Sequence, residues 1–131
     1  MERAFGGRLP TAVNLRDSDP VIDLEHLSGF TDGDLQLEGE ILALFLSSAE
    51  VYLARMGEAL RTGQSWMRVA HALKGASANL GARRVMKLAL AAEHSPPSAA
   101  QLDALQVAIE EVRTFERTPR GTVSGTIGAE R

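Results

Sequence analysis

The sequence offers few side chains that could carry out chemistry, because it contains three histidines and no cysteine. The missing cysteine excludes a disulfide framework, a thiolate zinc site and a cysteine nucleophile. His26 lies in a short helical segment, and His94 precedes a Pro-Pro break, where histidine commonly contacts free helix carbonyls. No two histidines are three or four residues apart, so we expect no metal site. His71 remains as the candidate for chemistry.

His71 lies in a predicted helix whose two faces differ in character. At about 100° per residue, one set of residues falls within about 60° of His71. This set consists of Gln64 (if the helix extends that far), Met67, Arg68, Lys74, Gly75 and Ala78. The opposite face is apolar and consists of Trp66, Val69, Leu73, Ala76 and Leu80. We therefore expect the apolar face to pack on the core and His71 to point to solvent.

The residues around His71 favour a reactive surface. Imidazole is nucleophilic near neutral pH, and Lys74, one turn away, can neutralise charge on a group attached to the ring. Gly75 and Ala78 remove side-chain bulk, so the active site of another protein could approach. A glycine inside a helix costs about 1 kcal/mol relative to alanine, which calls for a reason. Each of these residues alone would be an ordinary surface residue; their combination favours a site.

Turn residues and the spacing of apolar residues predict five helices. No segment shows the alternation of apolar and polar residues that is typical of a strand. The first is short, begins after Asp23 and ends near Gly29, and the second spans about 37–60 and is stopped by Gly63. The third spans 66–80, with Ser65 as its cap and Gly81 as its stop.

The last two predicted helices lie on either side of a proline break. One spans about 83–93 and ends at Ser95-Pro96-Pro97, and the other opens with a capping box from Ser98 to Gln101. Because residues 82–95 are poor in large side chains, we expect this helix to be the loosest part of the core.

These elements predict an all-α fold. Short connections favour antiparallel neighbours, so we expect an antiparallel up-down four-helix bundle with a short additional N-terminal helix. The bundle would span residues 21–117, between a flexible N-terminal arm (1–20) and a flexible C-terminal tail (118–131). A chain of 131 residues with 44% hydrophobic residues suits one domain.

Charge and hydropathy narrow the function further. The formal net charge of −3, without a basic run, argues against nucleic-acid binding. No run of eighteen apolar residues could cross a membrane, and the N-terminus lacks the apolar region of a secretory signal. We therefore expect a soluble, cytoplasmic protein.

The segment 70–81 closely resembles the signature of histidine-containing phosphotransfer (HPt) domains. It runs from Ala70 through His71, Lys74 and Gly75 to Gly81. Other parts of the chain also look like the corresponding family segments. These are residues 23–27, the long second helix with Phe45, and residues 88–93, so the resemblance covers 21–115.

The resemblance implies roles for single residues. His71 would be the phosphoacceptor, Lys74 the charge-stabilising neighbour and Gly75 the opening for the partner. Ser77 and Asn79 stand where the family has small polar residues, and we expect them to support the site rather than act directly.

The implied reaction is reversible phosphoryl transfer between His71 and an aspartyl phosphate on a receiver domain. The protein would need no cofactor, because the receiver would supply Mg²⁺ and an acidic pocket. This sequence has no phosphate-binding glycine loop and no obvious acidic cluster beside His71, so we expect a phosphocarrier rather than an autonomous ATP-dependent kinase. The implied partners are response-regulator receiver domains and a hybrid histidine kinase, and we expect a monomer.

Two other interpretations stay open at this point. One is the phosphoacceptor and dimerisation element of a sensor kinase, although such elements typically continue after histidine with Glu and then Arg-Thr-Pro. The other is a non-catalytic helical adaptor that uses the His71 face only for docking, although docking alone requires neither His71 nor Lys74.

Overall fold

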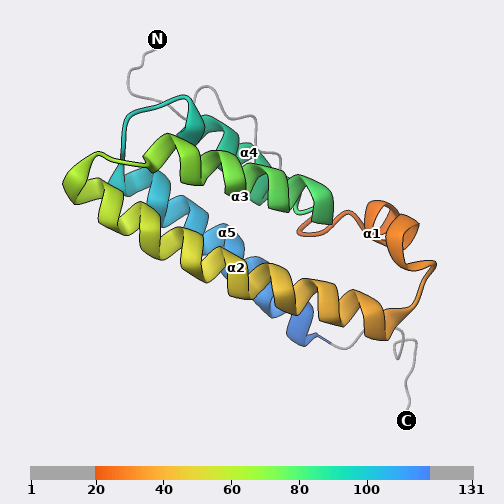
Figure 1. The fold of residues 1–131 in the computed structure, drawn as a ribbon. Helices are drawn as coiled ribbons and strands as arrows, with labels where there is room; N and C mark the ends of the chain where they lie inside the picture. Colours follow the sequence, from red (N-terminus) through yellow and green to blue (C-terminus); the bar gives the residue numbers. More distant parts are fainter. Residues whose placement is uncertain (1–19, 119–131) are drawn as a thin grey trace.

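The computed structural model describes residues 20–118, which form five α-helices and no strand (Figure 1). The helices are α1 (Leu24–Thr31), α2 (Leu35–Thr62), α3 (Trp66–Leu80), α4 (Arg83–Glu93) and α5 (Ala99–Arg117). The predicted all-α class is confirmed. The arm expected over 1–20 and the tail expected over 118–131 lie, apart from one residue each, outside the described residues. Within residues 20–118, no helix is long and apolar enough to cross a membrane.

Most helix ends follow the predicted capping pattern. The Asp23 side chain accepts a hydrogen bond from the His26 N–H, and the Ser98 side chain accepts one from the Gln101 N–H. Gly63 (φ 74°) and Gly81 (φ 88°) end α2 and α3 in the left-handed conformation that glycine adopts at low cost. At Gly81, a Cβ would also lie 3.2 Å from the Asp23 carbonyl oxygen.

Two predicted boundaries were wrong by two residues. α1 continues through Gly29 to Thr31 and ends where Asp32 turns left-handed (φ 58°). α2 begins at Leu35, because Asp34 caps it by accepting the Leu37 N–H. The free-energy cost of a glycine in a helix is small enough for neighbouring contacts to offset it, whereas a capping side chain fixes the residue at which a helix begins.

Two predicted caps are only partly formed. Ser65 stands at the N-cap of α3 but has a left-handed backbone (φ 71°) and makes no side-chain capping bond. A capping side chain needs an extended backbone at that position. Only half of the capping box predicted for α5 forms. The Ser98 side chain caps the helix, but the Gln101 side-chain amide donates to the Ser95 hydroxyl (3.3 Å) instead of binding the Ser98 backbone.

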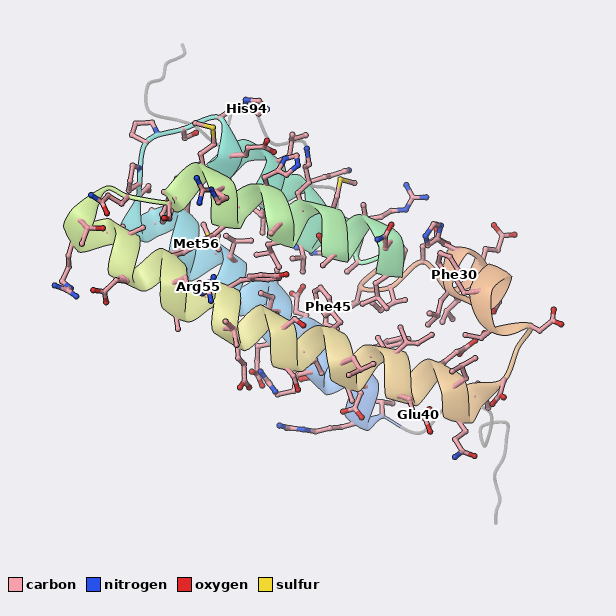
Figure 2. The ribbon with its side chains drawn as sticks, viewed as in Figure 1. Phe30, Glu40, Phe45, Arg55, Met56 and His94 are labelled. Atoms are coloured by element: carbon pink, nitrogen blue, oxygen red, sulfur yellow. The ribbon has the colours of Figure 1, made fainter. Side chains whose placement is uncertain are left out.

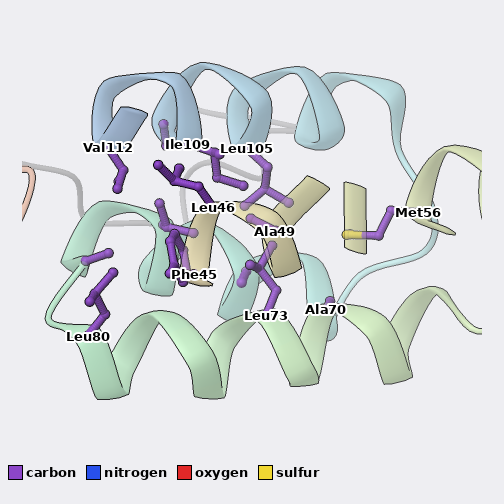
Figure 3. Close-up of a cluster of buried hydrophobic side chains, with 14 of the residues drawn as sticks. Phe45, Leu46, Ala49, Met56, Ala70, Leu73, Leu80, Leu105, Ile109 and Val112 are labelled. Carbon is purple, nitrogen blue, oxygen red and sulfur yellow. The ribbon is translucent and has the colours of Figure 1, made fainter. Parts of the chain in front are cut away.

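The core lies between α2, α3, α4 and α5. α2 packs against α3 and α5, and α4 packs against the same two helices. Figure 3 shows side chains of α2, such as Leu46 and Ala49, between Leu73 of α3 and the pair Leu105 and Ile109 of α5. Of these, Ala49, Leu73 and Leu105 have no exposed surface. One continuous apolar core therefore supports α3 from behind.

The expectation that the fourth helix is loosely packed is not supported. Val85, Ala89 and Ala92 of α4 are at most 1% exposed. Small side chains allow two helices to approach closely, and α4 makes its most extensive contact with α3. α4 is thus held firmly beside the helix that carries His71.

α1 lies at one end of the molecule, beside the C-terminal end of α3 (Figure 1). The Asp23 N–H donates to the Gly81 carbonyl (2.8 Å), and the Arg83 guanidinium donates to Asp23 Oδ2 (2.6 Å). His26 Nε2 donates to the Asn79 carbonyl (2.9 Å). These polar contacts fix α1 to the turn between α3 and α4.

Candidate functional site

His71 lies on the solvent side of α3, as the helical pattern predicts. Its side chain is 65% exposed. On the opposite side of the helix, Trp66 is 2% exposed, Val69 5% and Leu73 0%. The core therefore holds α3 by its apolar face and presents the imidazole outward.

A carboxylate from the neighbouring helix holds the ring. His71 Nδ1 lies 2.7 Å from Glu93 Oε2, and Lys74 Nζ lies 3.1 Å from Glu93 Oε1. The Glu93 side chain is only 14% exposed, so most of it is enclosed by protein. Glu93 thus links the two residues of α3 that the sequence singled out.

The C-terminal end of α4 is anchored so that Glu93 meets His71. The Trp66 indole N–H donates to the Ala92 carbonyl (2.9 Å), which joins the beginning of α3 to the end of α4. The Ser95 hydroxyl donates to the Ala91 carbonyl (2.7 Å). The position of Glu93 is therefore set by backbone contacts on both sides of it.

The protonation of the pair follows from its electrostatics. The hydrogen bond from His71, and secondly that from Lys74, lower the pKa of the Glu93 carboxyl below its ordinary value. Glu93 is therefore ionised at neutral pH and can only accept hydrogen bonds. Because a carboxylate cannot donate, Nδ1 of His71 carries the hydrogen of this bond, so the neutral form of the ring has its lone pair on Nε2.

Gly75 lies inside α3, and nothing within this fold requires a glycine there. Its φ is not positive, and a Cβ built on it would meet no atom within 4 Å. The space at Gly75, about one turn from His71, is therefore open, and access for a partner stays the predicted reason for the glycine.

The other predicted contact residues lie around this opening. Met67 is 63% exposed, and Arg68 and Ala78 are also exposed. Gln64 is exposed too, but α3 begins at Trp66 and does not reach it, so Gln64 belongs to the loop before the helix. The condition for placing Gln64 on the His71 face, that the helix extends to it, is therefore not met, and its role as a contact residue stays a prediction.

The polar residues beyond Gly75 contribute to structure. The Ser77 side chain is fully buried, and its hydroxyl donates to the Leu73 carbonyl (2.7 Å) within α3. Asn79 uses its backbone carbonyl to bind His26. His94 is exposed at the end of α4, far from Phe30 at the other end of the molecule (Figure 2). Neither His26 nor His94 lies in the His71–Glu93–Lys74 cluster.

An apolar groove of about 530 Å³ runs between α2 and α3 toward α1. Its lining residues are Phe30, Ile41, Leu44, Phe45, Ser48, Tyr52, Ala76, Asn79 and Leu80. Leu44 is 70% exposed and Phe30 is 59% exposed, so the groove carries apolar surface that this chain leaves uncovered. Asn79, which also lines the groove, lies four residues after Gly75, so the groove comes within about one turn of α3 from Gly75.

Glu93 is the site residue that the sequence analysis did not identify. It is 22 residues from His71 in the sequence, so no local spacing connects them. One signal was present: an acidic side chain in the last turn of a helix opposes the helix dipole. Such an unfavourable placement indicates a compensating partner, here the imidazole and the ammonium group of α3.

Comparison with known proteins gives one match. The family model described as the Hpt domain matches residues 40–115, which is more than half of the chain and includes His71, Lys74, Gly75 and Glu93. No curated protein and no solved structure matches the chain significantly.

Proposed function

Because the chain belongs to the Hpt domain family, whose members carry out histidine phosphotransfer in phosphorelays, we propose that it shuttles a phosphoryl group between receiver domains and His71. The observation that carries the proposal is the arrangement of the ring. His71 is exposed, its Nδ1 is bound to Glu93, and its Nε2 is free to act as a nucleophile beside an opening at Gly75.

The transfer itself is an exchange at phosphorus. Nε2 attacks the phosphorus of an aspartyl phosphate, the N–P bond forms, and the P–O bond to aspartate breaks as its carboxylate leaves. Phosphoryl transfer needs in-line positioning and charge neutralisation more than covalent help. Lys74 supplies a positive charge one turn from the ring, and the receiver supplies Mg²⁺ and its acidic pocket. The reverse exchange passes the group to a second receiver.

We assign the docking of the receiver to the α2–α3 side of His71. Hpt domains interact with receiver domains and with histidine kinases, so a protein partner must cover the ring during transfer. The apolar groove between α2 and α3 includes Asn79, about one turn of α3 after Gly75. On the α4 side, the ion pair of Lys74 with Glu93 borders His71 instead. An apolar helix face of the receiver would fit the groove, and Met67 and Arg68 would be further contacts near the N-terminal end of α3.

The remaining parts of the proposal concern the whole chain. We propose that α2 to α5 form the antiparallel up-down bundle, since the connections between successive helices, 63–65, 81–82 and 94–98, are short. The protein would act as a cytoplasmic monomer, and its donor would be a hybrid histidine kinase. Size-exclusion chromatography with light scattering tests whether the protein is a monomer. A tight dimer would favour a kinase dimerisation element.

Phosphoryl uptake from a receiver tests the proposed function directly. The protein is incubated with a receiver domain carrying labelled aspartyl phosphate and Mg²⁺, and the product is treated with acid and with base. We expect label that is lost in acid and survives base, as a phosphoramidate does. His71→Gln should take up none, whereas the matched control His94→Gln should take up as much as the parent. Label retained by His71→Gln would contradict the proposal.

A further inference from the structure

We propose that Arg68 binds the phosphoryl group once it is attached to His71 and so prolongs the lifetime of the phosphorylated protein. This inference rests on the proposed phosphorylation of His71 and adds a second cation to the site beside Lys74. The guanidinium N–H groups of Arg68 would donate hydrogen bonds to the phosphoryl oxygens. Arg68 itself would form and break no covalent bond.

The charge of Lys74 is already shared with a carboxylate. Lys74 Nζ lies 3.1 Å from Glu93 Oε1, and the Lys74 side chain is only 27% exposed. A phosphoryl group carries negative charge at neutral pH, so phosphorylation would bring further negative charge to His71. Because Glu93 offsets part of the positive charge of Lys74, a phosphoryl group at this site calls for a cation that is not paired within the protein.

Arg68 is such a cation. Its side chain is exposed, and within residues 20–118 it makes no ion pair or hydrogen bond. Arg68 stands three residues before His71 on α3, a spacing at which two Cβ atoms are about 5–6 Å apart. Side chains of a helix lean toward its N-terminus, so the imidazole of His71 extends over the turn that contains Arg68. The guanidinium is therefore within reach of a group attached to Nε2.

Arg68 and Lys74 lie on opposite sides of His71. At about 100° per residue, Arg68 is about 60° to one side of His71 and Lys74 is about 60° to the other. Lys74 is on the side of α4, with which it forms its ion pair. Gly75 is on the Arg68 side, and so is Asn79 of the apolar groove. A phosphoryl group on His71 would thus have a cation on each side, with Arg68 on the side where we expect the receiver.

The chemistry of phosphoryl transfer indicates what this contact would do. A guanidinium presents its N–H donors in a planar fork that matches the oxygens of a phosphoryl group. Hydrolysis of the phosphorylated protein breaks the N–P bond, forms a P–O bond to water and returns the N–P electron pair to Nε2. Because its transition state is loose, negative charge moves from the phosphoryl oxygens toward the ring nitrogen. A cation on those oxygens therefore stabilises the phosphorylated protein more than the transition state, and slows hydrolysis.

Arg68→Gln removes the charge and keeps a polar side chain of similar length. Each protein is phosphorylated with phosphoramidate, the excess donor is removed, and the decay of phosphohistidine is followed by ³¹P NMR. No receiver is present, so any effect arises within this chain. We expect the half-life of Arg68→Gln to be about fivefold shorter than that of the parent at low salt. The difference should shrink at about 1 M salt, where charges are screened within about 3 Å.

The contact itself is observed through the arginine Nε–H resonances of ¹⁵N-labelled protein. In the parent, one resonance should shift on phosphorylation, and it should be the resonance that Arg68→Gln lacks. Arg68→Lys keeps the charge but not the planar fork, and should recover part of the half-life. Arg117→Gln, the same change at an exposed position in the last turn of α5, should decay as the parent does.

Circular dichroism checks that the variants are folded; should Arg68→Gln unfold, Arg68→Lys must show a smaller shortening of the half-life. A phosphorylated Arg68→Gln with the half-life of the parent, or an Arg68 resonance that phosphorylation leaves in place, would overturn the inference. A normal half-life with slower transfer from a receiver would also overturn it, since Arg68 would then contact the partner rather than the phosphoryl group. Absence of phosphorylation in the parent would overturn the proposed function instead.

Discussion

At the scale of single residues, the proposed roles of His71 and Gly75 are those of nucleophile and point of access. Glu93 binds Nδ1 of the exposed His71 ring, and the missing Cβ of Gly75 leaves open space about one turn further along α3. The glycine is unfavourable for the helix, because alanine at such a position is better by about 1 kcal/mol. A larger side chain at position 75 should therefore stabilise the helix but obstruct access to His71, and these two effects can be measured separately.

Gly75→Ala should stabilise the protein by up to about 1 kcal/mol, because the added methyl group meets no atom within 4 Å. Gly75→Gln should fold at least as well as the parent but accept phosphoryl groups from a receiver at least about tenfold more slowly, a barrier change of about 1.4 kcal/mol. Denaturant unfolding and timed transfer measure the two effects.

Phosphoramidate serves as the control for Gly75→Gln, because this small donor needs no protein docking. Its reaction with His71 should be affected much less than transfer from the receiver. Equal losses with both donors would indicate damage to His71 itself, and normal transfer from the receiver would show that Gly75 is not an access position.

The residues of α3 could be identified from the sequence, and Glu93 could not. His71, Lys74 and Gly75 share one helix, so their relative positions follow from helical geometry alone. The contact with Glu93 depends on how α4 is rotated and how far it extends along α3. That register is set by tertiary contacts such as the Trp66–Ala92 hydrogen bond, for which the sequence contains no local pattern.

At the scale of elements, the helix ends show which local signals are decisive. Glycines with positive φ at positions 63 and 81 ended helices as predicted, because few other residues adopt that conformation cheaply. Gly29 did not end α1, since its backbone stays helical and a Cβ there would meet nothing. Ser65 has the right residue type for a cap, but its backbone is left-handed. Residue type predicts a boundary, and backbone conformation decides whether the capping bond forms.

The attachment of α1 predicts a dependence of stability on pH. The hydrogen bond from Arg83, followed by that from the His26 N–H, lowers the pKa of Asp23 below its ordinary value. A carboxyl group with a lower pKa in the folded state stabilises the fold above its pKa in the unfolded chain, about 3.9. That stabilisation is lost as the pH falls through the lower folded value. Asp23→Asn can still cap α1 but cannot form the ion pair.

We therefore expect Asp23→Asn to be less stable than the parent at pH 7, with a difference that shrinks as the pH falls below about 4. Denaturant unfolding at pH 7, 5 and 3 measures the difference. Asp34→Asn, the same change at the N-cap of α2, provides the control for effects of capping. A difference for Asp23→Asn that is as large at pH 3 as at pH 7 would mean that the Arg83 ion pair does not stabilise the fold.

At the scale of the whole molecule, the described surface carries two apolar grooves in different places. One lies between α2 and α3 and includes Asn79, about one turn of α3 after Gly75. The other is built on α5 and Val21, and it includes Val107, Glu110 and Phe115. Because α5 packs against α2 and α4, its groove is separated from α3 by the other helices. We therefore expect a partner that reaches His71 to cover the first groove and not the second.

This asymmetry predicts that Leu44 and Val107 respond differently to the same substitution. Both are exposed, 70% and 62%, so Leu44→Asp and Val107→Asp should each change the free energy of unfolding by no more than about 0.5 kcal/mol. An aspartate in the α2–α3 groove removes apolar contact and places a charged group against the apolar helix face of the receiver. Leu44→Asp should therefore raise the receiver concentration needed for half-maximal transfer about tenfold, or about 1.4 kcal/mol of binding free energy.

Val107→Asp should leave the receiver concentration needed for half-maximal transfer unchanged, and both variants should react normally with phosphoramidate. The opposite pattern, with loss only in Val107→Asp, would place the receiver on α5, a position from which His71 on α3 could not be reached.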